Sequence, residues 1–172
     1  NFVGEVGNDP DPSLENRVKE ADLIIAIGTR LNSSTTQNFT LIEAPRPKQK
    51  LVHVHPDPAV LGRVHETDLS INIGVGEFVA ATLEMEPVEG GRWCDSTAEA
   101  RREYLSSLTP PIYGGALDIG QVMAELDERL TPDAIVTLDA GNFSGWPRQF
   151  LKYGGGRRML SPAAVGSLGY GV

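Results

Sequence analysis

Cysteine is nearly absent from this sequence of 172 residues. Cys94 is the single cysteine, so no disulfide can form within the chain, which fits a reducing cytoplasm. No motif surrounds Cys94, and we therefore interpret it as an idle or buried thiol rather than a nucleophile. On this ground we predict a cytoplasmic protein.

Positive charge and long apolar runs are also lacking. The formal net charge is −8 and the isoelectric point is about 4.8, whereas nucleic-acid binding requires clustered lysine and arginine. The same charge argues against an anionic membrane surface, and no apolar run is long enough to span a bilayer. We expect neither nucleic acid nor membrane as a partner. A phosphate ligand stays compatible, because backbone N–H groups and a metal ion can supply a local positive field.

Several well-known site motifs are missing. The sequence has no GxGxxG after its first strand, no GxxxxGK[ST] and no GxSxG. A dinucleotide fingerprint, a P-loop and a hydrolase nucleophile elbow are therefore unsupported.

Turn formers and short apolar runs are what the sequence does contain. Its 19 glycines and 12 prolines fit an α/β fold with short loops. Residues 23–27 form a continuous apolar run, typical of a strand covered on both faces. A short helix over 13–21, with Ser13 as its N-cap, precedes this strand. Beyond it we expect a polar loop (32–49), strands at 50–55 and 69–73, and a helix over 75–84. This order predicts a parallel, Rossmann-like sheet.

The pattern stops near residue 88 and restarts after residue 115. The intervening segment, 89–115, is predicted as a linker that contains a helix at about 95–108. Residues 116–172 then offer a helix over 117–130, a strand over 134–141, a helix over 146–151 and a strand over 157–160. Such a segment is too short for a complete domain, because its small sheet would leave apolar faces and edges unpaired. We therefore expect an incomplete second α/β segment, and a piece of a larger protein.

Residues of the first segment suggest a possible nucleotide site. Gly28, Thr29 and Arg30 follow the first strand, and ligands of open α/β sheets bind beyond the carboxyl ends of strands. Arg30 could clamp a phosphate or a carboxylate, but a turn glycine and a surface arginine are the favoured interpretation of the pattern.

Three histidines invite a metal-site interpretation. His53 and His55 alternate on one strand and so share a face, with His65 ten residues further on. No cysteine or carboxylate pattern completes a metal site. Polar or capping roles are the favoured interpretation.

The second segment offers two glycine-containing loops. Asp139, Gly141 and Asn142 stand just past a predicted strand, where a glycine lets backbone N–H groups face a phosphate. The stretch GSLGYG, residues 166–171, is a second loop that could closely approach a ligand.

The order of these blocks is more specific than any one of them. The series "EADLIIAIGTRL", "KLVHVHPDPAVLGR", "DLSINIGVGEFVAATLE", "IVTLDAGNFSGW" and "GSLGYGV" resembles the thiamine-diphosphate-dependent, acetolactate synthase-like enzymes over almost the whole chain. The resemblance implies that residues 1–88 are the C-terminal part of a central Rossmann-like domain. It also implies that residues 116–172 begin the domain that binds the cofactor's diphosphate.

The resemblance assigns cofactor-binding roles to two short stretches. The family's VGQH-like turn, which lies beside the diphosphate, corresponds here to Ala140, Gly141, Asn142 and Phe143. Asn142 keeps an amide side chain, whereas Phe143 replaces a polar histidine. The family's GxMG stretch corresponds to Gly166, Ser167, Leu168 and Gly169. There the glycine carbonyl accepts from the aminopyrimidine, and Leu168, similar to Met in volume, would prop the bent cofactor.

The resemblance also bears on FAD, which the central domain of some relatives binds. Gly28 and Arg30 match a GxR stretch used there. His55 stands where an acidic residue would hold a ribose, and the family's RFDDR stretch is replaced by residues 30–34. We therefore expect no tightly held FAD.

Taken together, these features imply a fragment of an enzyme that uses thiamine diphosphate and Mg²⁺ on 2-oxo acids, as a synthase (transferase) or a decarboxylase (lyase). The family's catalytic glutamate and its GDG metal-binding stretch are not found in the sequence, so we expect the isolated chain to be inactive, with no catalytic and no metal-binding residue of its own. A homodimer or homotetramer is the expected assembly. Two alternatives stay open: a non-catalytic nucleotide-binding module, and a structural or interaction piece.

Overall fold

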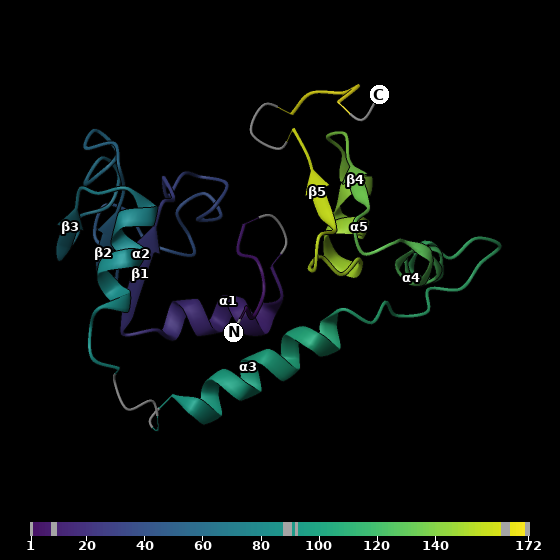
Figure 1. Ribbon diagram of the computed structural model, residues 1–172, viewed down its shortest axis with the longest axis horizontal. Coiled ribbons are helices and arrows are strands. Elements are labelled where there is room, and N and C mark those ends of the chain that lie inside the picture. Colours follow the sequence, from purple (N-terminus) through teal and green to yellow (C-terminus); the bar gives the residue numbers. More distant parts are fainter. Residues whose placement is uncertain (1, 8–9, 88–90, 92, 163–165, 171–172) are drawn as a thin grey trace. The chain divides into compact units, whose positions relative to one another are not determined.

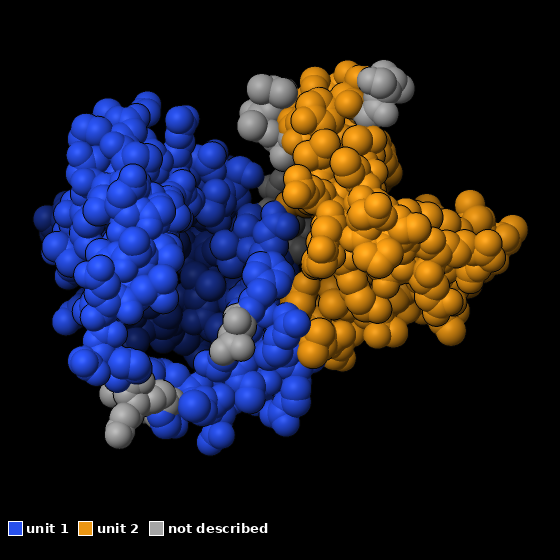
Figure 2. Space-filling view, in the orientation of Figure 1, with its two compact units in different colours: residues 1–103 blue, residues 104–172 orange. Residues whose placement is uncertain are grey.

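The computed structural model describes residues 2–7, 10–87, 91, 93–162 and 166–170. The chain divides into two compact units, residues 1–103 and residues 104–172, which Figure 2 shows in different colours. The predicted boundaries at residues 88 and 115 stay a prediction.

Unit 1 is built on a three-stranded parallel sheet. Its strands are β1 (Leu23–Ile27), β2 (Lys50–Val54) and β3 (Leu69–Ile71), hydrogen-bonded in the order β1-β2-β3 (Figure 1). Both strand pairs are parallel. The predicted α/β class with a parallel Rossmann-like sheet is thereby confirmed, and the three predicted strands lie where the apolar runs indicated.

The core of unit 1 lies on one face of this sheet. Ala26 of β1 and Leu51 of β2 pack there with three residues of the segment between these strands, Leu31, Leu41 and Ile42. The segment was predicted as a polar loop. It contains turns and no helix or strand, yet it covers the sheet, because its few apolar side chains face inward.

The other face of β1 differs from the prediction. Leu23, Ile25 and Ile27 are 45%, 54% and 42% exposed, so β1 is covered on one face and not on both. Alternate residues of a strand point to opposite faces, and these three lie opposite Ala26. The continuous apolar run shows that both faces are apolar, not that both are covered in this chain.

The helices of unit 1 begin close to their predicted positions. They are α1 (Pro12–Glu20), α2 (Val75–Leu83) and α3 (Cys94–Ser107), whose last residues belong to unit 2. The predicted N-cap Ser13 is wrong. Asp11 caps α1, and its Oδ1 accepts from the Ser13 backbone N–H at 2.8 Å. Pro12 occupies the first helical turn, where a missing N–H costs nothing, so the cap lies one residue before it.

Unit 2 contains the second α/β segment. Its elements are α4 (Ile119–Arg129), β4 (Ile135–Thr137), the 3₁₀ turn η2 (Asn142–Ser144), α5 (Gly145–Phe150) and β5 (Arg158–Leu160). Strands β4 and β5 are parallel neighbours, with Val136 opposite Met159 (Figure 1). Ile135 and Leu160 are 61% and 42% exposed, so this small sheet leaves apolar surface uncovered in the described residues.

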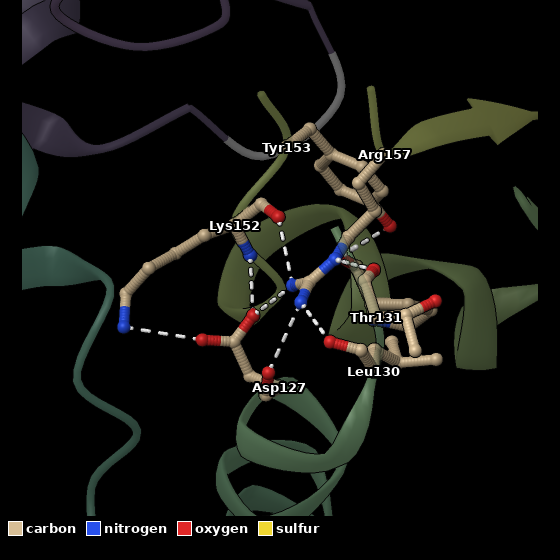
Figure 3. A network of polar contacts seen from close by, with 7 residues as sticks. Asp127, Leu130, Thr131, Lys152, Tyr153 and Arg157 are labelled. Carbon is tan, nitrogen blue, oxygen red and sulfur yellow. Dashed lines mark hydrogen bonds and ion pairs between the residues drawn. The ribbon is translucent and has the colours of Figure 1, made fainter. Parts of the chain in front are cut away.

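Arg157 joins α4 to the start of β5 (Figure 3). Its guanidinium donates to Asp127 Oδ1 at 2.6 Å and to the backbone carbonyls of Asp127 and Leu130 near the end of α4. It also donates to the carbonyls of Thr131 and Lys152. A cation at a helix C-terminus satisfies carbonyls that have no partner within the helix.

Asp127 is the anionic centre of this network. Its carboxylate accepts from the Lys152 backbone N–H at 2.9 Å and lies 3.1 Å from Lys152 Nζ. Burial alone would raise the pKa of Asp127, but the hydrogen bonds of Lys152 and Arg157 outweigh it and hold that pKa below its usual value. Asp127 and Arg157 thus fix α4 against the strand pair that carries the candidate site.

Among the described residues, no helix combines the length and the apolar composition required to cross a membrane.

Candidate functional site

The two glycine-containing loops of unit 2 lie together beyond the carboxyl ends of β4 and β5. The Leu138 N–H donates to the Leu160 carbonyl at 2.9 Å, which extends the strand pairing by one residue. The Ala140 N–H then donates to the Ser167 carbonyl at 3.2 Å. Residues 139–145 and residues 166–170 therefore form one surface, at the edge of the sheet where α/β proteins bind ligands.

Asp139 ties the second loop to the first. Its Oδ1 accepts from the Tyr170 N–H at 2.8 Å, and its Oδ2 accepts from the Gly169 N–H at 3.0 Å. Hydrogen bonds to an ionised acceptor are among the stronger ones in proteins. From the sequence we predicted only that Asp139 stands just past the end of a strand. Its hydrogen bonds to Gly169 and Tyr170 were not predicted.

The first loop carries the four residues that the family resemblance marked. Gly141 has a φ of 149°, and the Gly141 carbonyl accepts from Ser144 N–H at 3.0 Å. A Cβ on Gly141 would lie 2.8 Å from the Phe143 ring, so this ring packs directly against the glycine. Asn142 and Phe143 are exposed. Phe143 presents no polar atom to a ligand, whereas the Asn142 amide does.

The second loop turns on two glycines. Gly166 and Gly169 have φ values of 63° and 78°, which L-residues with side chains rarely adopt. A Cβ on Gly166 would meet nothing within 4 Å, so a ligand can come close to that backbone. Leu168 is 76% exposed, although the backbone on both sides of it is held by hydrogen bonds.

These features fit one part of thiamine diphosphate. An approachable glycine backbone followed by a large exposed aliphatic side chain suits a ring system that must be contacted and propped. No corresponding fit is found for magnesium, because the described residues include no group of three histidine, cysteine, aspartate or glutamate side chains that could hold a metal ion. The cofactor roles of Ala140 to Phe143 and of Gly166 to Leu168 stay predictions.

The possible nucleotide site lies in unit 1. Gly28 has a φ of 70°, and its N–H donates to the Val54 carbonyl at 2.9 Å. A Cβ there would lie 2.9 Å from a methyl group of Val75, at the start of α2. Arg30 is exposed. Its role in binding a nucleotide stays a prediction.

The three histidines of unit 1 are buried and bonded to the backbone. His53 Nε2 lies 2.8 Å from the Thr29 carbonyl, and His65 Nε2 lies 3.2 Å from the Ile42 carbonyl. The Asp57 N–H donates to His55 Nδ1 at 3.0 Å. These contacts account for the histidines as polar supports of loops, the interpretation that the sequence favoured.

Comparison with known proteins shows which proteins the chain is similar to. Residues 1–82 match the family model described as thiamine pyrophosphate enzyme, central domain; thiamine pyrophosphate and thiamine diphosphate are the same compound. The acetolactate synthase large subunit of Parasynechococcus marenigrum (strain WH8102) is 30% identical over 176 residues. That alignment covers 99% of this chain and 27% of the relative.

Further relatives come from a plant and from an enterobacterium. Acetolactate synthase 2, chloroplastic, of Zea mays is 27% identical over 162 residues, covering 90% of this chain and 25% of the relative. The acetolactate synthase isozyme 2 large subunit of Escherichia coli (strain K12) is 22% identical over 171 residues, covering 99% of this chain and 30% of the relative. The chain thus spans between a quarter and a third of these relatives. Residues 1–82 match the central domain of the thiamine pyrophosphate enzyme family, and almost the whole chain is similar to acetolactate synthases.

Proposed function

We propose that this chain is part of an enzyme that uses thiamine diphosphate and Mg²⁺ to make or break carbon–carbon bonds of 2-oxo acids. The relatives with which it aligns are named acetolactate synthases. The observation that carries the proposal is the surface at the carboxyl edge of β4 and β5. There Gly166 and Leu168 are exposed on a loop that Asp139 and Ala140 hold in place.

Residues of this chain would bind and orient the cofactor. The amide of Asn142 and the backbone around Gly141 would face the diphosphate, and the Gly166 carbonyl would accept a hydrogen bond from the aminopyrimidine. Leu168 would fill the space beneath the bent cofactor. When bound, thiamine diphosphate supplies a nucleophilic carbon that attacks the 2-carbonyl and allows carbon dioxide to leave. Positioning of this kind contributes to rate by holding reacting groups in the productive geometry.

The remaining machinery is expected outside this chain. We infer that a glutamate for proton transfer and the magnesium ligands come from other parts of the protein, and that the 172 residues alone are inactive. Whether the reaction ends as a transferase or a lyase step depends on the second substrate. A cytoplasmic homodimer or homotetramer without FAD is the form we propose.

A nucleotide-binding module is the weaker alternative. The start of α2 lies against Gly28, and a helix N-terminus attracts phosphate. However, the Glu77 carboxylate lies against Gly74, the residue that caps α2. This negative charge occupies the position at which an anion would benefit from the helix dipole.

Carbon dioxide release tests the proposed function. The protein as its gene encodes it is purified, stripped of small molecules, and incubated with pyruvate or 2-oxobutyrate. We expect release only when both thiamine diphosphate and Mg²⁺ are restored, and none from the 172-residue chain. Turnover that is unaffected by removal of thiamine diphosphate, or turnover by the isolated chain, would contradict the proposal.

A further inference from the structure

Asp139 makes contacts that its position in the sequence does not explain. It follows β4 by two residues, and its two carboxylate oxygens accept hydrogen bonds from two consecutive backbone N–H groups, those of Gly169 and Tyr170. These donors lie 30 and 31 residues further along the chain. A side chain that only ended the strand would bond to neighbours a few residues away.

The loop of residues 166–170, which Asp139 contacts, is held by few other hydrogen bonds among those described. Residues 166–170 belong to no helix or strand, and all five are exposed. Gly166 N–H donates to the Pro162 carbonyl at 2.8 Å, and Ala140 N–H donates to the Ser167 carbonyl at 3.2 Å. Among the described hydrogen bonds, only those of Asp139 hold the part of the loop after Leu168.

Leu168 therefore lies between two anchored neighbours. Ser167 is held through its carbonyl and Gly169 through its N–H, while the Leu168 side chain itself is 76% exposed. The direction of an exposed side chain is set by its backbone, so the Asp139 bonds fix where Leu168 points. A loop fixed before binding loses less conformational entropy when a ligand arrives.

We propose that Asp139 is a positioning residue: its carboxylate holds the 166–170 loop, and with it Gly166 and Leu168, in the conformation that receives thiamine diphosphate. The identity of the ligand, thiamine diphosphate, rests on the proposed function. The holding of the loop by Asp139 does not, because the loop can be observed without any cofactor.

The test is Asp139→Asn, which has nearly the same shape but places an amide NH₂ against one of the two N–H donors. Backbone amide exchange is measured in the protein as its gene encodes it. We expect exchange at Gly169 and Tyr170 to accelerate about tenfold or more, as expected for a lost bond to a charged acceptor. The Leu138 amide, which pairs β4 with β5, should keep its protection and so report an intact fold.

The matched control is Asp133→Asn at the opposite end of β4. Asp133 is exposed and bonds to Thr131 in the preceding turn, so its substitution should leave Gly169 and Tyr170 unchanged. Asp139→Ala serves as a second variant that removes both acceptors. If it fails to fold, Asp139→Asn still decides the question.

Cofactor affinity is the second readout. By calorimetry with Mg²⁺ present, we expect Asp139→Asn to weaken thiamine diphosphate binding five- to tenfold and Asp133→Asn to leave it within twofold. Unchanged exchange at Gly169 and Tyr170 would overturn the proposal, as would faster exchange with unchanged affinity. A wild-type protein that binds no thiamine diphosphate would refute the proposed function and the cofactor role of Asp139. The exchange data would then still decide whether Asp139 holds the loop.

Discussion

At the scale of single residues, Leu168 is the side chain most directly expected to affect turnover. Its exposure on an anchored loop suits a prop, and a prop acts on the shape of the bound cofactor rather than on its retention. We predict that Leu168→Ala lowers kcat about 10- to 100-fold while the Kd for thiamine diphosphate changes less than about threefold.

Leu168→Met is the control for this prediction. It conserves volume and apolar character, so kcat should stay within about threefold of wild type. Steady-state kinetics and calorimetry on the two variants give the comparison. Equal losses of kcat and of affinity in Leu168→Ala would indicate a simple binding contact, and wild-type turnover would rule out the prop.

Single residues also show what the sequence could and could not predict. Gly166 and Leu168 were singled out because a glycine and a large apolar residue at that spacing match a family pattern, and their cofactor roles stay predictions. The contacts of Asp139 were not predicted, because its partners lie 30 and 31 residues away and no local pattern encodes such a contact. Ser13 was predicted as the N-cap, whereas Asp11 is the N-cap in the structure. Both residue types cap helices well, so only the position of the helix start separates them.

At the scale of elements, the strands were predictable and their environment was not. Short apolar runs bounded by turn residues located β1, β2 and β3. The same runs could not show that one face of β1 stays exposed, because periodicity reports which faces are apolar and not which partners are present. The segment between β1 and β2 was expected as a polar loop. Its Leu41 and Ile42 are buried in the core, since irregular segments carry no period from which burial can be inferred.

The Arg157 network fixes the elements of unit 2 that carry the site. Both side chains of its central ion pair are about 11–12% exposed, and Arg157 donates to five oxygens. Removing Arg157 leaves the largely buried Asp127 carboxylate with Lys152 as its cation and removes the donor of four backbone carbonyls. We predict that Arg157→Ala lowers the free energy of unfolding by about 3 kcal/mol, measured by urea denaturation followed through tryptophan fluorescence.

The neighbouring Arg158→Ala is the matched control. Arg158 is exposed on β5, and its replacement should change stability by no more than about 0.5 kcal/mol. Arg157→Lys should recover less than half of the lost free energy of unfolding, because one ammonium group cannot donate to five acceptors placed around a planar guanidinium group. If Arg157→Ala and Arg158→Ala unfold at the same urea concentration, the network does not stabilise unit 2 as described.

At the scale of the whole molecule, this chain contains two units with different relations to the family. Unit 1 contains the residues that match the central domain, and unit 2 contains the proposed cofactor surface. The chain covers 27% of the relative from Parasynechococcus marenigrum. The family resemblance was predictable from the order of the sequence blocks, because that order is retained when single motifs change.

The measurement that tests this account most directly is an amide-exchange footprint of thiamine diphosphate with Mg²⁺ on the protein as its gene encodes it. We predict slower exchange over residues 139–145 and 166–170, and no change over residues 28–31. Protection confined to residues 28–31, or protection that bypasses both loops of unit 2, would contradict the assignment of the cofactor site to the carboxyl edge of β4 and β5.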